Sequence, residues 1–377
     1  MKINARHYPL LLFVVWTVVQ SFLLLFKGIN LGGESYKALQ NGLLLYEGKP
    51  LPDRSSMLYF TETFFVFLMH LLKAGPWFVV LIHLLLNALA LFILNNFLNK
   101  FYRSKTLSFI ACILLLFCFP YQEYNTYLYT ESAFFSLTIL YSCFVLSRKR
   151  FDLLTLGKMA AFLAMLCITR PTGIFFAGAT FVYLLFAAQR LSMFQRIFIF
   201  TTTGIAGLFI LNFLMGIGGP IDILRPFKEG NVICEVPQSY LEFGPTNVVN
   251  GNSLGGLLIY ISENPAMFFK LVWLKTKAFF GLYREHYSNG HNIFIMGFFF
   301  PLYILLATSL IIKWKMLPKE IVWYLAIIMV YWLSVAFSCD EWHNRFFLTL
   351  TPFIIIPSLL IFAKLSSTKY SFPSSHY

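Results

Sequence analysis

Ten apolar runs dominate this chain, and each is long enough, or nearly long enough, to cross the hydrocarbon core of a bilayer. A spanning helix needs ~17–25 predominantly apolar residues. The runs lie at residues 8–26, 76–98, 107–120, 129–147, 153–169, 172–188, 196–217, 292–313, 321–338 and 346–364. A soluble domain carries about 25% charged residues, whereas this chain has 12% charged and 58% hydrophobic residues. The sequence therefore predicts an all-α polytopic membrane protein with about ten transmembrane helices.

The basic residues come in small clusters between the apolar runs and give a net charge of +13. They form no single basic face, which argues against a nucleic-acid partner and favours the positive-inside pattern. One further apolar run, 58–72, is short and carries Glu62 and His70. If it does not cross, all the basic clusters fall on one side: Lys2/Arg6, Lys100/Arg103/Lys105, Arg148/Lys149/Arg150, Arg190/Arg196, Lys313/Lys315/Lys319 and Lys364/Lys369. We therefore predict that 58–72 is interfacial or re-entrant and that both termini are cytoplasmic.

This topology predicts a single transmembrane domain over residues 1–377 with two long outer loops, 27–75 and 218–291. The second of these loops contains several prolines and is expected to be largely irregular. Its end, 265–283, has the spacing of an amphipathic helix that lies on the membrane surface. The inner loops are short and basic, so any chemistry is expected at the outer face.

Two carboxylates are the candidate catalytic groups, Glu34 in the first outer loop and Glu131 at the outer end of the run 129–147. Each also fits a structural role, because an acid in the first turn of a helix is stabilised by the helix dipole. Thr130 is a candidate cap for the helix that carries Glu131. An ionisable group that faces a membrane bundle marks a functional site, which keeps the catalytic interpretation open.

Arg170 and Arg345 lie on the side that the positive-inside rule leaves poor in cations. The planar guanidinium group suits phosphate, so both are candidate phosphate ligands, with His343 beside Arg345. The alternative for Arg170 is a snorkelling side chain or a structural pair with a carboxylate. Cys234 and Cys339 fall in outer loops, and the sequence leaves open whether they pair.

The order of these motifs resembles the GT-C integral-membrane glycosyltransferases, the group of the aminoarabinose and protein-mannosyl transferases. The resemblance covers most of residues 8–190 and about the last fifty. It lies in an acid after the first span, Tyr129-Thr130-Glu131-Ser132, Thr169-Arg170-Pro171-Thr172-Gly173 and His343-Asn344-Arg345-Phe346.

The resemblance implies transfer of a sugar from a polyprenyl-phosphate donor to a lipid, glycan or protein acceptor at the outer face of a cell membrane, expected to be a bacterial inner membrane. The membrane lipid is a further expected partner. Glu34 and Glu131 take the catalytic positions, and Arg170, Arg345, His343 and Tyr36 the substrate-binding ones. The family often has two adjacent acids in the first loop, but here Gly33 precedes Glu34. No metal ligand is therefore assigned, and a divalent ion stays an open question.

Two other classes compete with this interpretation. A lipid-linked polysaccharide polymerase or ligase uses similar outer arginines but needs no acid in the first loop. A transporter needs charged residues or broken helices near the middle of the membrane. The predicted span interiors are almost purely apolar, which makes the transporter the weaker alternative.

Overall fold

In the computed structural model the described residues, 7–52, 54–148, 150–187, 192–216, 224–234, 236 and 252–363, form helices and no β-strand longer than an isolated bridge. This confirms the all-α class. Several residues used in the sequence analysis lie outside the described residues: Lys2, Arg6, Lys149, Arg190, Lys364, Lys369 and much of the loop 218–251.

Each of the ten predicted runs contains at least one described helix. Among the described residues, three helices are long and apolar enough to cross a membrane: α1 (Tyr8–Lys27), α4 (Trp77–Phe101) and α14 (Asn289–Ile312). Two pairs of consecutive helices are also apolar enough but are bent at a short break, and the number rises to five if each pair is one span. The bend is 72° between α5 (Lys105–Phe117) and residues 119–126. It is 108° between α12 (Leu254–Glu263) and α13 (Pro265–Gly281). These helices agree with the predicted membrane protein, and the predicted number of ten spans stays a prediction.

The chain divides into two compact units. The first unit comprises residues 1–177, 300–321 and 351–377, and the second comprises 178–299 and 322–350. The expectation of a single domain stays a prediction.

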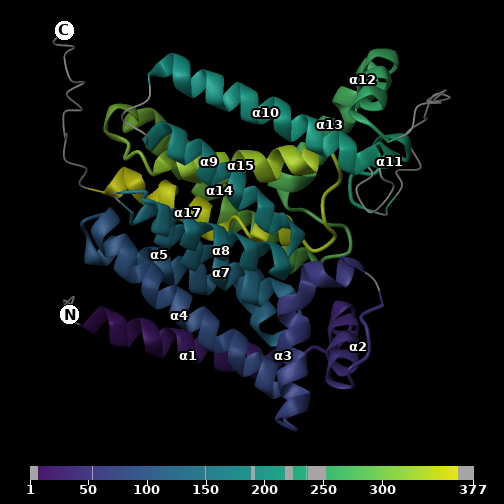
Figure 1. Ribbon diagram of the computed structural model, residues 1–377. Helices are drawn as coiled ribbons and strands as arrows, with labels where there is room; N and C mark the ends of the chain where they lie inside the picture. The colour runs from purple at the N-terminus through teal and green to yellow at the C-terminus, as the bar shows by residue number, and fades with distance from the viewer. Residues whose placement is uncertain are drawn as a thin grey trace. The chain divides into compact units, whose positions relative to one another are not determined.

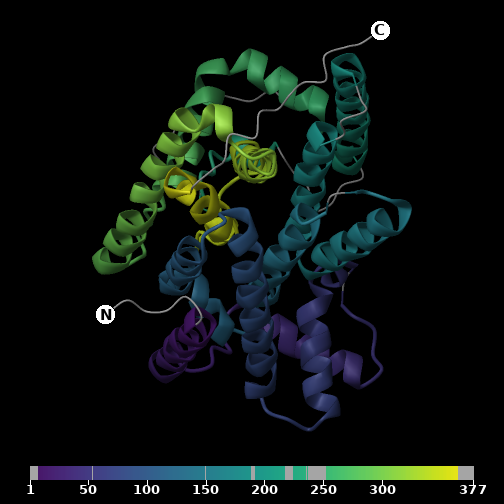
Figure 2. The ribbon, with the colours of Figure 1, turned by 90° about the vertical axis from the view of Figure 1, so that its left-hand side faces the viewer.

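The first unit is a helical bundle. Besides α1, α4 and α5 it contains α2 (Glu34–Tyr46), α3 (Phe60–Leu71), α6 (Phe119–Gln122), α7 (Thr130–Leu146), α8 (Leu153–Thr169) and α17 (Thr351–Ser358). The helices α1, α4 and α5 lie side by side, and α2 packs on α3 (Figure 1). The run 58–72 forms a short 3-10 helix, Arg54–Tyr59, followed by α3. Figure 2 shows α3 beside α4, with a short turn joining them.

The α7 helix forms the centre of this bundle, since nearly every residue of it is buried. It packs against α4 and α8. Aromatic pairs fill the spaces around it, for example Tyr141 with Phe162 and Phe134 with Phe176, both edge to face. The two ends of α7 are therefore the places where polar side chains can meet other elements.

The second unit contains α10 (Met193–Gly216), α11 (Arg225–Lys228), α12, α13, α15 (Ile321–Ala336) and α16 (Arg345–Leu348), with parts of α9 (Ile174–Ala187) and α14. The helix predicted at 265–283 is confirmed as α13, and its position on the membrane surface stays a prediction. Its apolar residues Phe268 and Leu271 pack with Phe227 of α11 and Tyr260 of α12 in a small core.

Candidate functional site

Glu131 and Arg170, which the sequence analysis singled out separately, form a buried ion pair in the first unit. Glu131 is the second residue of α7, and its Oε1 contacts Nη1 of Arg170, which follows the last residue of α8. The Glu131 side chain is fully buried and that of Arg170 is 8% exposed. Thr130 starts α7 rather than preceding it, and its hydroxyl donates to Glu131 Oε2 over 3.4 Å. The carboxylate therefore neutralises a cation that would otherwise be buried at high cost.

The break after α8 follows directly from the sequence. Pro171 cannot continue a helix and holds Arg170 in an extended conformation, with φ −153° and ψ 142°. At Gly173 the chain returns so close to α8 that an added Cβ would lie 2.5 Å from the carbonyl carbon of Leu166. This break turns the Arg170 side chain out of the helical path and toward the start of α7.

A second buried pair joins Glu62, near the start of α3, to His83 of α4. The Oε2 of Glu62 lies 3.0 Å from Nε2 of His83, and the two side chains are 1% and 0% exposed. The neighbouring Thr61 shares a 2.7 Å hydrogen bond with Thr169, the residue before Arg170. The two ion pairs are thus neighbours in one polar cluster, which is formed by α3, α4, α7 and the end of α8.

The sequence analysis noted Glu62 and missed His83. Glu62 Oε1 and His83 Nδ1 are buried and accept or donate no hydrogen bond among the described residues. The sequence offered only an ionisable residue in each of two mainly apolar helices, and nothing in its spacing showed that the helices would meet there.

Glu34 opens α2 as predicted, and its loop is fastened to the segment that leads into Glu131. Asn30 N donates to Thr126 O over 2.9 Å, and Glu34 N donates to the Tyr129 hydroxyl over 3.3 Å. Tyr129 in turn donates to Gly32 O over 3.2 Å. The Glu34 side chain is exposed, so the loop sets one acid at the surface near the start of the helix that carries the other.

The conformation of Gly33 and its close neighbour disfavour any side chain at this position. Gly33 adopts a φ of 58°, and a Cβ there would lie 2.3 Å from the Tyr129 hydroxyl oxygen. A carboxylate side chain would strain the backbone and displace Tyr129. Tyr36, one turn into α2, is 71% exposed and is therefore open to a substrate.

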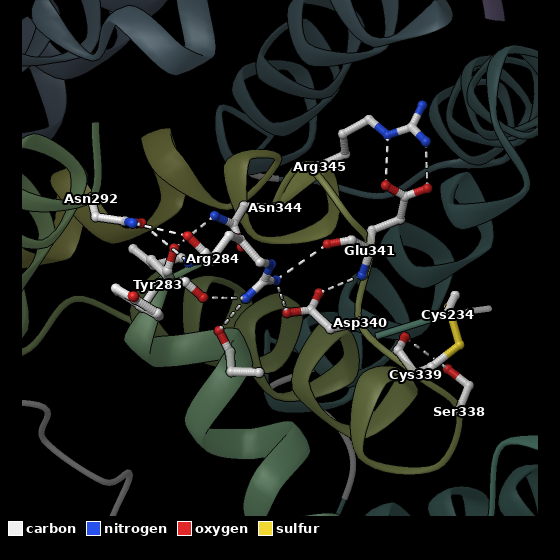
Figure 3. A network of polar contacts seen from close by, with 12 residues as sticks. Cys234, Tyr283, Arg284, Asn292, Ser338, Cys339, Asp340, Glu341, Asn344 and Arg345 are labelled. Atoms are coloured by element: carbon white, nitrogen blue, oxygen red, sulfur yellow. Dashed lines mark hydrogen bonds and ion pairs between the residues drawn. A yellow bond between two sulfur atoms is a disulfide. The ribbon is translucent and has the colours of Figure 1, made fainter. Parts of the chain in front are cut away.

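Arg345 is the first residue of α16 in the second unit (Figure 3), and His343 lies two residues before it, between α15 and α16. The Arg345 guanidinium contacts the carboxylate of Glu341, four residues earlier in the loop before α16, in two places, and in one of them Nε donates to Oε2 over 2.8 Å. His343 is exposed, and its ring lies 5.6 Å from that of His286. Their placement relative to Glu34 and Arg170 stays a prediction.

The same segment is fixed by a buried network that the sequence analysis did not find (Figure 3). Arg284 Nη2 lies 2.5 Å from Asp340 Oδ2, and neither side chain is exposed. Asn292 and Asn344 satisfy backbone groups beside it: Asn292 Nδ2 donates to Arg284 O and Asn344 Nδ2 to Leu282 O, each over 2.9 Å. Burial raises the pKa of the Asp340 carboxyl above its ordinary value, and the adjacent guanidinium opposes that shift.

Cys234 and Cys339 form a disulfide, which settles the question that the sequence left open. Around it, Cys234 N donates to Asp340 O, and Asp340 N donates to Val232 O, each over 2.8 Å. The bridge therefore ties the segment that carries Asp340, Glu341 and Arg345 to the loop before α12.

In the part of the chain that the structure describes, no three His, Cys, Asp or Glu side chains gather as ligands for a metal ion. Glu131 is held by Arg170, and the proposed chemistry uses no metal ion. No family model, curated protein or solved structure matches the chain. The functional argument consequently rests on the arrangement of the residues.

Proposed function

We propose that the chain is a GT-C-type membrane glycosyltransferase that moves a hexose or pentose from a polyprenyl-phosphate donor to an acceptor at the outer face of a cell membrane. The observation that carries the proposal is the fastening of the Glu34 loop to the segment before Glu131, together with the Glu131–Arg170 pair. Three residues chosen from the sequence for one reaction thus come from elements that contact one another.

In this proposal Glu34 is the base that takes the proton of the acceptor hydroxyl. Glu34 is exposed and suits that role, whereas Glu131 is fully buried and held by Arg170. Glu131 therefore acts as a positioning residue that keeps the guanidinium in place. Arg170 supplies the positive charge that stabilises the leaving phosphate, because charge develops there in the transition state. Arg345, His343 and Tyr36 complete the proposed substrate contacts.

The proposed topology has about ten spans and places both termini in the cytoplasm. The disulfide supports it, because Cys234 and Cys339 both fall in loops predicted to lie outside. Disulfides form and persist in oxidising compartments such as the bacterial periplasm. A bacterial inner membrane fits this arrangement.

The test is sugar transfer by purified protein in proteoliposomes that contain labelled polyprenyl-phosphate sugars and an acceptor extract. Glu34→Gln keeps the size of the side chain but removes the base, so turnover should fall by ~10²–10⁴ while donor binding survives. Glu47→Gln, at the exposed C-terminal end of the same helix, is the matched control and should transfer at the wild-type rate. Wild-type turnover in Glu34→Gln would refute the role of Glu34. No transfer by the wild-type protein from any donor would refute the proposed function.

Two alternatives remain distinguishable. A lipid-linked polysaccharide polymerase or ligase would keep its activity in Glu34→Gln, since it needs no acid in that loop. A proton-coupled transporter is favoured by one specific observation, the buried Glu62–His83 pair, because paired ionisable groups inside a membrane bundle mark proton paths.

A further inference from the structure

An open groove lies in the first unit, between α4, α7 and α8, and plays no part in the proposed function. Its volume is about 480 Å³. Its walls are mainly apolar, with Leu89, Ile93 and Phe97 on α4 and Leu140 and Phe144 on α7.

One end of this groove is polar and positively charged. Lys100 at the end of α4 and Arg148 just after α7 line it, together with Asn96 and Ser147. Both cations are exposed, and the Arg148 guanidinium carbon lies 4.2 Å from the centroid of the Phe144 ring. This cation–π contact holds Arg148 at the rim, where it can meet an anion.

The length of the groove matches one leaflet. From Leu89 to Lys100 the lining residues of α4 recur on one helical face. Eleven residues at 1.5 Å each extend over about 16 Å, and half of a ~30 Å hydrocarbon core is ~15 Å. An acyl chain in the groove would therefore end near the bilayer centre while its headgroup reaches the two cations.

We propose that this groove binds an anionic diacyl phospholipid of the leaflet that faces the basic end of the first unit, with its phosphate on Lys100 and Arg148. Basic pockets between membrane helices recognise such headgroups. The choice of a phospholipid follows from the position of the groove. The polyprenyl-phosphate donor is proposed to act near Arg170, directly after the C-terminal end of α8, whereas Arg148 of the basic rim precedes the N-terminal end of that helix. The site does not depend on the proposed glycosyl transfer.

The test is a titration of the purified full-length protein in neutral detergent with phosphatidylglycerol, followed by native mass spectrometry. Each cation near an anionic headgroup contributes about a fivefold gain in affinity, so Lys100→Gln with Arg148→Gln should weaken binding about 30-fold. The matched control, Lys105→Gln with Arg150→Gln, removes the same charge from exposed residues of the same basic end that do not line the groove. It should bind phosphatidylglycerol within about threefold of the wild-type affinity, because the attraction between a cation and an anionic headgroup falls off with distance.

Two further variants keep the test independent of folding. Lys100→Arg with Arg148→Lys keeps both charges and should retain the lipid. Ile93→Trp fills the apolar wall without a change of charge and should lower the affinity for the diacyl lipid. Equal binding of phosphatidylglycerol and phosphatidylcholine, equal binding by the wild type and the Lys100/Arg148 double variant, or displacement of phosphatidylglycerol by stoichiometric polyprenyl phosphate would overturn the proposal.

Discussion

The Glu131–Arg170 pair has a structural role and a proposed functional role, and a double-mutant cycle separates them. Glu131→Gln removes the charge that neutralises the guanidinium of Arg170, whose side chain is only 8% exposed. Removing one partner of a buried ion pair typically costs about 3–5 kcal/mol in unfolding free energy. Because Arg170 also lies beside the Thr61–Thr169 contact, the loss is expected to loosen the end of α8 as well.

Replacing both partners should restore most of that stability. In Glu131→Gln with Arg170→Met neither charge is left buried, and replacement of a whole buried pair is often neutral or stabilising. We therefore expect the double variant to lie within about 1.5 kcal/mol of the wild type, which corresponds to a coupling energy of several kcal/mol. Sugar transfer should stay lost, since the cation proposed to stabilise the leaving phosphate is gone.

The assay is reversible unfolding of the purified protein in mixed micelles, with transfer measured on the same samples. The matched control is Arg225→Met, which removes a cation from an exposed pair with Glu229. An exposed pair of this kind contributes about 0–1 kcal/mol. A cost below about 1 kcal/mol for Glu131→Gln would contradict the buried pair that the structure shows. Wild-type transfer by the double variant would contradict the role of Arg170.

Three more predictions concern the second unit and the topology. Asp340→Asn should destabilise the protein by about 3–5 kcal/mol in the same unfolding assay, because Arg284 keeps its carbonyl partners but loses its counter-charge; Asp340→Asn at wild-type stability would mean that the network does not hold the segment. Cys234→Ser with Cys339→Ser opens a loop of 105 residues in sequence separation, worth up to about 4–5 kcal/mol by loop entropy, so the variant should unfold at a lower temperature than the oxidised wild type and match the reduced wild type. Arg103→Cys should resist an impermeant thiol reagent outside intact cells, and its labelling there would invert the predicted topology.

The sequence predicted the helices well because apolar periodicity is a local property. The ranges of α8 and α1 agree with the predicted runs to within one residue, and Pro171 correctly marked the break before α9. The helix α12 was missed, since the loop around it was expected to be irregular. Ser253 gave the available signal: its hydroxyl accepts a hydrogen bond from Gly256 N and caps the helix before an apolar run.

Contacts between distant segments were the part that local patterns could not predict. Glu131 and Arg170 were each singled out, but their pairing depends on how α7 and α8 pack. His83 and Asp340 needed the same information, because a lone polar residue in an apolar chain shows that it must be satisfied without showing by which partner. Gly33 is the most instructive case, because the contact that disfavours a side chain there comes from Tyr129, 96 residues further along the chain.

The choice between glycosyl transfer and proton-coupled transport depends on two carboxylates with opposite environments. Glu34 is exposed, as the proposed base requires, whereas Glu62 is 1% exposed and shares a hydrogen bond with His83. In a glycosyltransferase Glu34→Gln should abolish sugar transfer, while Glu62→Gln keeps a hydrogen bond to the imidazole and should leave transfer within about tenfold of the wild type, since a neutral hydrogen bond contributes only ~0.5–1.5 kcal/mol.

In a proton-coupled transporter the order reverses, because Glu62→Gln cannot carry a proton and Glu34 has no part in the path. Both variants are therefore reconstituted in the same way, and two activities are measured in the proteoliposomes. The first is sugar transfer from labelled polyprenyl-phosphate sugars. The second is uptake of the labelled sugars, measured together with the change in luminal pH that a pH-sensitive dye reports. Loss of transfer in Glu34→Gln alone supports the glycosyltransferase. Loss of dye-coupled uptake in Glu62→Gln alone replaces it with the transporter, because a surface base cannot explain a function that only the buried carboxylate controls.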